Sequence, residues 1–413
     1  MCYNKMTIYP YATNNYQMIK NMKSRIVVML AVICTACLCA CAINAQGFYE
    51  TKNREIVSEE EKQTDILPDI ESAEKKDPYP GTAIACGQEI PVTGINGIRI
   101  GQAENADAGT GVTVFISENG MPAGLDVRGG GPASRESQLL NPLMAAQQIH
   151  AVVLGGGSAF GLQAANGVMQ YLEEHNIGFD VGVTKVPLVA QSDIFDLTVG
   201  DPFTRPDPDM GYEAARRAME QPNYKDGNYG AGCGATVGKM AGMDYCMKSG
   251  IGSYAVRIGD LEIGAVVAVN ALGDIYDWKT GQQVAGLLSE DKTGLCSTSE
   301  YMAGENRSVA DAFADNTTIG IIITNAQFNK AQLCKIAGMA HDGFARSIRP
   351  VHTSADGDSI YAVSVGTVES DQDLVGELAS EVMSEAILRA VMNAESAYGY
   401  PSVSEIGHAD TMP

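Results

Sequence analysis

The sequence is poor in basic residues. It contains 28 Lys and Arg against 50 Asp and Glu, and its formal net charge is −22 at pH 7. An excess of negative charge on this scale disfavours attraction to nucleic-acid phosphates or to an anionic bilayer surface. We therefore predict no nucleic-acid partner.

Cysteine is also scarce once the N-terminal segment is set aside. Half of the ten cysteines lie within the first 41 residues, which leaves Cys86, Cys233, Cys246, Cys296 and Cys334. Their number is odd, their spacing is irregular and no CxxC pair remains, so neither a zinc site nor a regular disulfide scaffold is indicated. We predict buried or idle thiols, and neither a metal nor another cofactor.

One long apolar run occurs near the N-terminus. Residues 26–42 follow three basic residues and precede a stretch of small residues. This pattern is typical of a secretory signal and is too short for a confident membrane span. We predict an exported protein with a signal over residues 1–45, translated from either Met1 or Met22.

Two endings of this signal stay open. Cleavage after Ala45 would release a soluble, periplasmic protein. Alternatively, the Leu-Cys-Ala-Cys stretch at residues 38–41 resembles a bacterial lipobox and would make Cys41 a lipid-anchored first residue. Residues 46–85 are charged and poor in large apolar side chains, which predicts an acidic leader. We predict that residues 86–413 form a single domain.

Hydrophobic patterning predicts a layered α+β sandwich. The predicted strands cover residues 111–117, 151–154, 318–324 and 359–366, and a hairpin turns at Gly259-Asp260. Three helices are predicted. The first follows Ser158 and has Phe160 on its apolar side, the second spans the apolar positions from Leu333 to Ile348, and the third runs from Asp373 to about Glu395. Strands cluster beside helices without strict alternation, which favours separate layers of each.

The glycine-rich stretch at residues 155–161 resembles two known motifs without matching either. Its glycines follow a GxGxxxG spacing, which differs from the dinucleotide-binding GxGxxG. Phe160 replaces the second glycine of a GxSxG nucleophile elbow around Ser158. Free amides at the start of the helix could still hold an anion or assist an oxyanion hole, so Ser158 is a predicted substrate-binding residue.

The stretch HTSADGDS, residues 352–359, concentrates polar side chains. His352, Asp356 and Asp358 are residue types that bind metals, but the further oxygens and the distal Glu of an EF-hand are absent. A metal site, a solvated turn and a catalytic carboxylate pair all remain open from these residues alone.

The stretch DNTTIGIIITNA, residues 315–326, places Thr317 at the start of a buried strand. A hydroxyl is a weak nucleophile at neutral pH, and one solution is an N-terminal Thr whose own α-amine acts as the base. Thr317 gains such an amine only if the Asn316–Thr317 bond is cut, by attack of Thr317 on the preceding carbonyl. An inert strand start is the commoner meaning of this pattern.

Several ordered blocks together resemble one known family. They are GLDVRGGGPASRES, AVVLGGGSAFGLQAANGVMQYLEE, GAGCGATVGKMAG, GAVVAVNALGD, NTTIGIIITNA and MAHDGFARSIRPVHTSADGDSIYA, between about Ile95 and the strand SIYAVSVG. They are similar to the P1 peptidases, the group that contains D-aminopeptidase/esterase, β-peptidyl aminopeptidase and nylon-oligomer hydrolases.

The resemblance implies an αββα sandwich of the N-terminal-nucleophile hydrolase type, assembled into homo-oligomers of αβ units. It implies self-cleavage into an α chain that ends at Asn316 and a β chain, Thr317–Pro413, with Thr317 as the nucleophile. The other matching catalytic positions are Lys239, Asn270, Asp356 and Asp358. The Asn-Thr pair is similar to the nylon-oligomer hydrolase branch, whereas aminopeptidase relatives carry other residue types at the last two positions.

These residue types suit the chemistry. Lys239 can favour the Thr317 alkoxide through its charge, and Asn270 can donate an amide hydrogen to the developing oxyanion. Asp358 would accept a hydrogen bond from Thr317 and Asp356 would orient Asp358, with the reverse assignment left open.

We expect an aminopeptidase or amidohydrolase that cleaves short peptides or amides through an acyl-enzyme. Phe195, within KVPLVAQSDIFDL, is the second predicted substrate-binding residue, although an aromatic side chain there is more often part of the core. The alternative among enzymes is an esterase or an endo-acting hydrolase of linear ω-amino-acid, nylon-like oligomers. The alternative of another class is a peptide-binding surface lipoprotein without turnover.

Overall fold

The computed structural model describes residues 87–305 and 316–406. One compact unit spans Tyr79–Pro413, and the elements below belong to it. The predicted signal, the acidic leader and Cys86 lie outside the described residues, as do residues 306–315 before Asn316.

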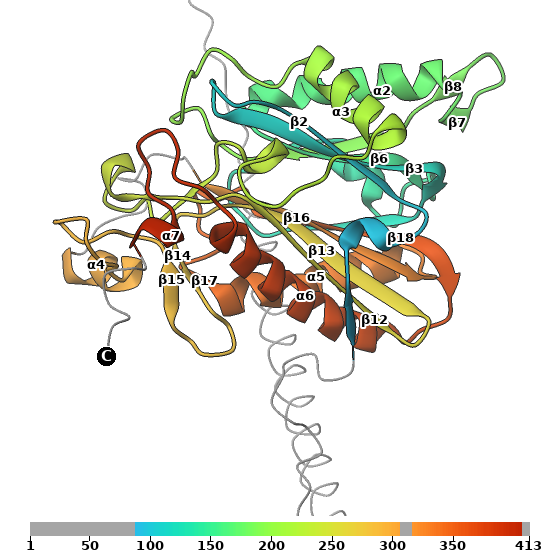
Figure 1. The fold of residues 1–413 in the computed structure, drawn as a ribbon. Coiled ribbons are helices and arrows are strands. Elements are labelled where there is room, and N and C mark those ends of the chain that lie inside the picture. The colour runs from blue at the N-terminus through green and yellow to red at the C-terminus, as the bar shows by residue number, and fades with distance from the viewer. Residues whose placement is uncertain (1–86, 306–315, 407–413) are drawn as a thin grey trace, which may run out of the picture. The chain divides into compact units, whose positions relative to one another are not determined.

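Two β-sheets form the centre of this unit (Figure 1). The six-stranded sheet contains, in spatial order, β1 (Gln88–Ile90), β12 (Ile251–Ile258), β13 (Leu261–Asn270), β16 (Thr317–Ala326), β18 (Ser359–Val368) and β4 (Ala123–Val127). The five-stranded sheet contains β2 (Arg99–Asn105), β3 (Thr110–Met121), β6 (Ile149–Gly155), β9 (Val189–Asp193) and β5 (Ala133–Arg135). Strand β16 is central in its sheet, antiparallel to β13 and parallel to β18.

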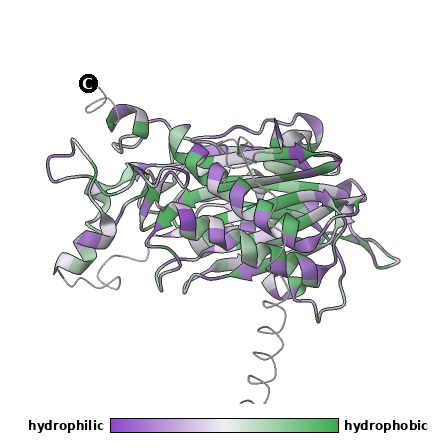
Figure 2. Ribbon diagram, turned by 90° about the horizontal axis from the view of Figure 1, so that it is seen from below, coloured by the Kyte–Doolittle hydropathy of each residue, from purple (hydrophilic) through white to green (hydrophobic). Residues whose placement is uncertain are grey.

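Two pairs of helices cover the outer faces of the sheets. Helices α5 (Lys330–Ser347) and α6 (Gln372–Met392) pack on the six-stranded sheet, and α2 (Ala164–Glu174) and α3 (Pro208–Glu220) pack on the five-stranded sheet. Separate hydrophobic clusters fill the space under each helix pair and the space between the sheets. The layers therefore follow the order α, β, β, α, which confirms the predicted sandwich. Figure 2 views the unit from below and shows apolar and polar residues alternating along the ribbons of these layers.

The remaining elements are short. The short strands are β7 (Phe179–Asp180), β8 (Lys185–Val186), β10 (Thr236–Val237), β11 (Met247–Lys248), β14 (Asp274–Tyr276), β15 (Gln283–Ala285) and β17 (Ile348–Arg349). The short helices are α4 (Thr298–Glu305) and α7 (Val403–Ile406), with 3₁₀ helices at Val92–Gly94, Ser137–Leu140, Ser158–Gln163, Gly230–Gly232 and Met243–Tyr245.

The sequence predicted most of the long elements. The four predicted strands lie within β3, β6, β16 and β18, and the predicted hairpin joins β12 to β13 at Gly259-Asp260. The prediction of a helix after Ser158 was partly wrong, because a 3₁₀ helix over Ser158–Gln163 precedes α2. A 3₁₀ helix has three residues per turn, so Phe160 does not follow the α-helical face. Its ring is exposed, and the Arg205 guanidinium lies 4.0 Å from the ring centroid.

Helix α3 was missed entirely. Asp207 caps it by accepting from the Met210 amide, and Pro208 occupies its first turn. Its buried residues are Gly211, Ala214, Ala215 and Ala218, so it has no stripe of large apolar residues to reveal it in the sequence.

Two further findings concern the described residues alone. Cys233, Cys246, Cys296 and Cys334 are free thiols there. Across the ranges 87–305 and 316–406, no helix is both long and apolar enough to cross a membrane.

Candidate active site

Thr317 is the first residue of β16 and is buried. The β-ladder places it opposite Asn270, the last residue of β13. Its hydroxyl lies against the carbonyl oxygen of Asn316 and also accepts from the Gly357 amide at 3.2 Å. Residues 319–323 continue the strand and are buried, and most of them have branched apolar side chains. The Thr317 hydroxyl is therefore attached to the start of a well-packed strand.

Asn270 is held in one orientation by three converging donors. Its Oδ1 accepts from Lys239 Nζ at 2.7 Å, from the Thr236 amide at 3.0 Å and from Thr236 Oγ1 at 3.3 Å. Because Oδ1 is thereby identified as the acceptor, the NH₂ group must lie on the other side, where Nδ2 donates to the Phe195 carbonyl at 2.9 Å. An amide fixed in this way can present a hydrogen to a developing oxyanion without reorganising.

Lys239 is a buried cation close to two carboxyl groups. Its Nζ donates to the Asn270 carbonyl at 3.1 Å as well as to the Asn270 side chain. Burial raises the pKa of Asp196 to about 6 and that of Asp356 to about 6, and the Lys239 charge opposes both shifts. Lys239 therefore contributes positive potential to the same region that contains the Thr317 hydroxyl and the Asn270 amide.

The two carboxylates of the HTSADGDS stretch have different surroundings. Asp358 Oδ1 accepts from the Thr318 amide at 2.8 Å, one residue from the nucleophile candidate. Asp356 Oδ2 accepts from the Thr353 amide at 2.8 Å and from Thr353 Oγ1 at 2.5 Å. Besides burial, the Asp358 charge raises the pKa of Asp356. Asp358 thus contacts the residue that follows Thr317, whereas Asp356 contacts a residue of its own loop.

Glycines let two backbone segments approach the nucleophile closely. A Cβ at Gly357 would lie 2.8 Å from Thr317 Oγ1, and a Cβ at Gly129 would lie 2.3 Å from the Asp358 amide nitrogen. The Gly131 amide donates to the Asp356 carbonyl at 2.8 Å, which ties the segment after β4 to this loop. Side chains at these positions would displace the loop from Thr317.

The predicted substrate-binding residues have other contacts. Phe195 contributes its backbone carbonyl to Asn270, and its side chain is half-buried. The Ser158 amide donates to the Ile194 carbonyl, and the Gly157 amide donates to Asp196 Oδ1 at 2.7 Å. The expectation of free amides at this helix start is therefore wrong for these two residues, because partners within the chain already bind them.

Sequence reasoning missed three supporting residues. Thr236 binds Asn270 and stands three residues before Lys239, within a block that was already singled out. Thr353 binds Asp356 and lies inside HTSADGDS. Asp196 follows Phe195 and also accepts from Thr110 Oγ1 at 2.7 Å. Proximity to a predicted site residue was the only sequence signal for each.

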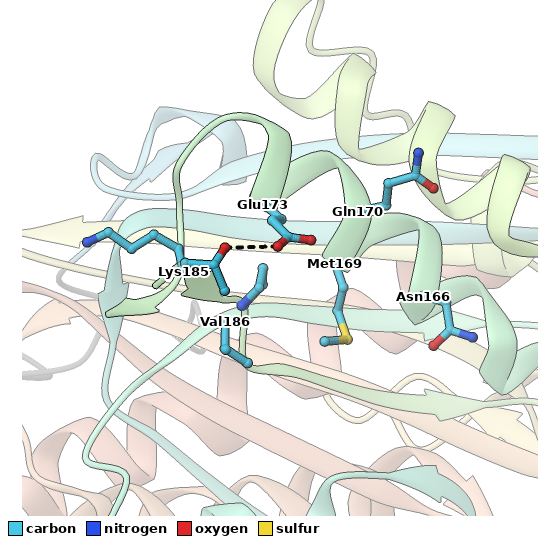
Figure 3. Close-up of a pocket in the computed structure, with 8 residues that line it drawn as sticks. Asn166, Met169, Gln170, Glu173, Lys185 and Val186 are labelled. Atoms are coloured by element: carbon cyan, nitrogen blue, oxygen red, sulfur yellow. Dashed lines mark hydrogen bonds between the residues drawn. The ribbon is translucent and has the colours of Figure 1, made fainter. Parts of the chain in front are cut away.

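His352 was considered as a metal ligand and instead contacts Asp358, with Nδ1 2.8 Å from Oδ2. Among the described residues, no group of three or more His, Cys, Asp or Glu side chains is arranged to hold a metal ion. A surface pocket of about 280 Å³ lies elsewhere, between α2 and the β7–β8 hairpin. Figure 3 shows its lining, which includes Asn166, Met169 and Glu173 and none of the predicted site residues.

Comparison with known proteins identifies the family of this chain. Residues 91–403 match Peptidase family S58. The chain belongs to peptidase family S58. A protein of Mycobacterium leprae named as an uncharacterized aminopeptidase is 36% identical over 337 residues, covering 75% of this chain and 92% of that protein. A 6-aminohexanoate-oligomer endohydrolase of Agromyces sp. is 30% identical over 322 residues, covering 74% of this chain and 86% of the endohydrolase.

Solved structures share the fold of this S58 chain. A Burkholderia sp. beta-aminopeptidase superposes with a TM-score of 0.54 at 17% identity, covering 79% of this chain and 96% of that one. The L-aminopeptidase D-Ala-esterase/amidase of Ochrobactrum anthropi, described as a variant of the Ntn hydrolase fold, gives a TM-score of 0.53 at 16% identity, with coverages of 76% and 89%. The family resemblance and the fold are thus confirmed, and the S58 chain is a hydrolase of peptide or amide bonds.

Proposed function

We propose that the protein is a self-processing aminopeptidase whose nucleophile is the Thr317 hydroxyl. One observation carries the proposal: this hydroxyl lies against the Asn316 carbonyl in the uncut chain, with Asn270 opposite in the ladder and Asp358 bound to the next amide. Attack of the hydroxyl on that carbonyl would shift the acyl group from nitrogen to oxygen. This shift would free the Thr317 amine, and hydrolysis of the resulting ester would then separate the two chains and restore the Thr317 hydroxyl.

The freed amine would supply the base that a hydroxyl needs. An unperturbed α-amine has a pKa of about 7.7 to 8.0, so a useful fraction is neutral near pH 7. The hydroxyl proton passes to this amine as Oγ1 attacks the substrate carbonyl, and then to the leaving amine as the carbon–nitrogen bond breaks. Water hydrolyses the acyl-enzyme. Asn270 would bind the oxyanion, and Asp358 would accept from the ammonium group.

Short peptides and small amides are the proposed substrates. The relatives named as aminopeptidases reach 34 to 36% identity, above the 30 to 31% of the oligomer endohydrolases. An endo-acting hydrolase of ω-amino-acid oligomers is the second candidate, favoured by those endohydrolase relatives and by the Asn316-Thr317 pair. Time courses on a defined 6-aminohexanoate oligomer and on a tetrapeptide distinguish the two, because an aminopeptidase releases single residues and an endohydrolase releases internal fragments.

N-terminal sequencing and intact mass of the purified protein test the proposed cleavage. We expect a fragment that begins Thr-Thr-Ile-Gly, and we expect Thr317→Ala to remain uncut and to lose amide turnover. Thr318→Val is the matched control, since the Thr318 hydroxyl has no partner among the described residues and the main-chain amide is retained. Wild-type protein that stays uncut after prolonged incubation would contradict the proposal.

We infer export from the N-terminal signal, with either release after Ala45 or a lipid anchor at Cys41. Fractionation of cells, with and without Cys41→Ala, tests the anchor, because an anchored protein would leave the membrane fraction in that variant. Assembly into homo-oligomers of αβ units is proposed from the family resemblance, and light scattering of the processed protein measures it.

A further inference from the structure

His352 is bound to Asp358, the carboxylate that accepts from the amide of the residue after Thr317. Its Nδ1 is 2.8 Å from Asp358 Oδ2, and its backbone amide donates to the same oxygen at 3.1 Å. The other oxygen, Oδ1, accepts from the Thr318 amide. A carboxylate oxygen is an acceptor, so Nδ1 must carry the proton of this bond. The two oxygens of Asp358 thus have separate partners, one on the loop and one on β16.

The imidazole of His352 is held from the opposite side by helix α5. It meets the His341 ring edge-on at 4.8 Å between centroids, and it stacks on Phe344 at 5.9 Å. Only 17% of its side chain is exposed, and its Nε2 has no hydrogen-bond partner among the described residues. A bare Nε2 agrees with the neutral tautomer that has its proton on Nδ1.

His352 also adopts an uncommon backbone conformation. Its φ is +58°, in the left-handed region that only a few per cent of non-glycine residues occupy, with Asn, Asp and His enriched among them. Such a conformation persists where surrounding contacts determine it, and it clusters at functional sites. Here the conformation brings both the amide and the ring nitrogen of one residue to the same carboxylate oxygen.

We propose that His352 is a positioning residue, which donates Nδ1–H to Asp358 Oδ2 so that Oδ1 stays at the Thr318 amide, one residue from the N-terminal group of Thr317. This role rests on the proposed Thr317 chemistry. In each turnover the Thr317 hydroxyl proton moves to the Thr317 amine and then to the leaving amine. His352 exchanges no proton in these steps. It keeps the acceptor that orients the ammonium group in place.

Several charged and titratable groups surround His352 and Asp358. Asp356 on the same loop and Lys239 across the site interact electrostatically with each other, and Asp356 also interacts with Asp358. From α5, His341 faces His352, with Asp126 and Arg128 behind it, and burial lowers the pKa of His341 to about 4, so its ring is neutral. Losing the His352 side chain would leave Asp358 Oδ2 with one donor, the His352 amide, so the carboxylate would be held less firmly.

Two substitutions that both tolerate positive φ test this role. His352→Asn keeps a side-chain N–H near the position of Nδ1, whereas His352→Gly removes it and leaves the backbone amide in place. We expect His352→Gly to lower kcat for alanine p-nitroanilide ~10²-fold with little change in KM, as expected for a misplaced catalytic group. His352→Asn should retain most of kcat, and added imidazole should partly restore the Gly variant.

His175→Asn is the matched control. His175 stacks on Tyr171 at the end of α2, in another layer of the sandwich, so its replacement should leave kcat and KM unchanged. Wild-type kcat in His352→Gly would overturn the positioning role alone. Equal losses in the Asn and Gly variants, at equal melting temperature, would also overturn it. A wild-type chain that never cuts before Thr317 would overturn the proposed function and this role together.

Discussion

At the scale of single residues, the site combines groups that are costly to bury. Lys239, Asn270 and Asp358 are almost fully shielded from solvent, and a buried polar group is stable only when it is hydrogen-bonded or paired. The structure meets this requirement with partners that also orient each group: Asn270 for Lys239, Thr236 for Asn270, and the Thr318 amide for Asp358. The bonds that stabilise these side chains therefore also fix their orientations.

Replacement of Asn270 should reduce the rate of the chemical step. We expect Asn270→Ala to lower kcat about 10²- to 10³-fold with KM little changed, because an oxyanion donor acts mainly in the transition state. Steady-state kinetics on the processed enzyme measure this. Thr236→Val is the control, since it removes only the longer 3.3 Å contact to Oδ1 and should cost much less. Equal losses in both variants would show that orientation, and not donation, limits the rate.

Asp356 should make stability depend on pH. Burial and the Asp358 charge raise its pKa to about 6, whereas an unfolded carboxyl titrates near 3.9. Between these values the native carboxyl holds a proton that the unfolded chain has released, so its contribution to the free energy of unfolding falls as pH rises. Asp356→Asn keeps an oxygen for Thr353 and cannot ionise.

Urea unfolding of wild type and Asp356→Asn between pH 4 and pH 7 checks this. We expect equal stability near pH 4 and a variant more stable by roughly 1–3 kcal/mol above pH 6, with lower activity. A stability difference that does not change with pH would contradict the assignment.

At the scale of elements, one central strand and one loop create the site. Strand β16 begins between the end of β13 and the start of β18, which brings together residues far apart in sequence. The loop before β18 is tied to the segment after β4, since the Arg128 and Gly129 amides both donate to the Asp358 carbonyl. Helix α5 supports that loop from behind through His341 and Phe344.

The N-terminus of α5 should contribute measurably to stability. Asn329 accepts from the Gln332 amide, and the Gln332 side chain accepts from the Asn329 amide, which forms a capping box. We expect Asn329→Ala to lower the free energy of unfolding by about 1 kcal/mol without changing kcat at temperatures well below melting. Asn329→Ser is the control and should lose less, because serine can cap. A large loss of activity at full folding would show that the cap also shapes the site.

At the scale of the whole unit, a glycine in each sheet allows an outer helix to pack closely against it. A Cβ at Gly252 would lie 2.2 Å from the Ala386 carbonyl of α6, and a Cβ at Gly101 would lie 2.3 Å from the Ala214 carbonyl of α3. Each helix can therefore approach its sheet at backbone contact. This close approach explains why the buried face of α3 consists of small residues.

Gly101→Ala and Gly252→Ala should each force a helix away from its sheet. We expect each to lower the free energy of unfolding by about 1–3 kcal/mol, as overpacked cores do, and the two losses to add in the double variant. Gly304→Ala is the control, since a Cβ there meets nothing within 4 Å. Denaturant unfolding followed by two probes tests whether residues 86–413 form a single domain. Two separate transitions would contradict the single domain.

The sequence by itself determined the layered class, the long strands, α5 and α6, the family and Thr317 as the candidate nucleophile. These follow from local periodicity and from the order of motif blocks, both of which can be read along the chain without knowledge of its tertiary contacts. Only the tertiary structure decided which way Asn270 points, which carboxylate accepts from the Thr318 amide and which amides at Ser158 are already bound. Each of these depends on partners distant in sequence, as when Asp196 takes the Gly157 amide across 39 positions. Helix α3 belongs with them, because an alanine face becomes informative only once the sheet it touches is known.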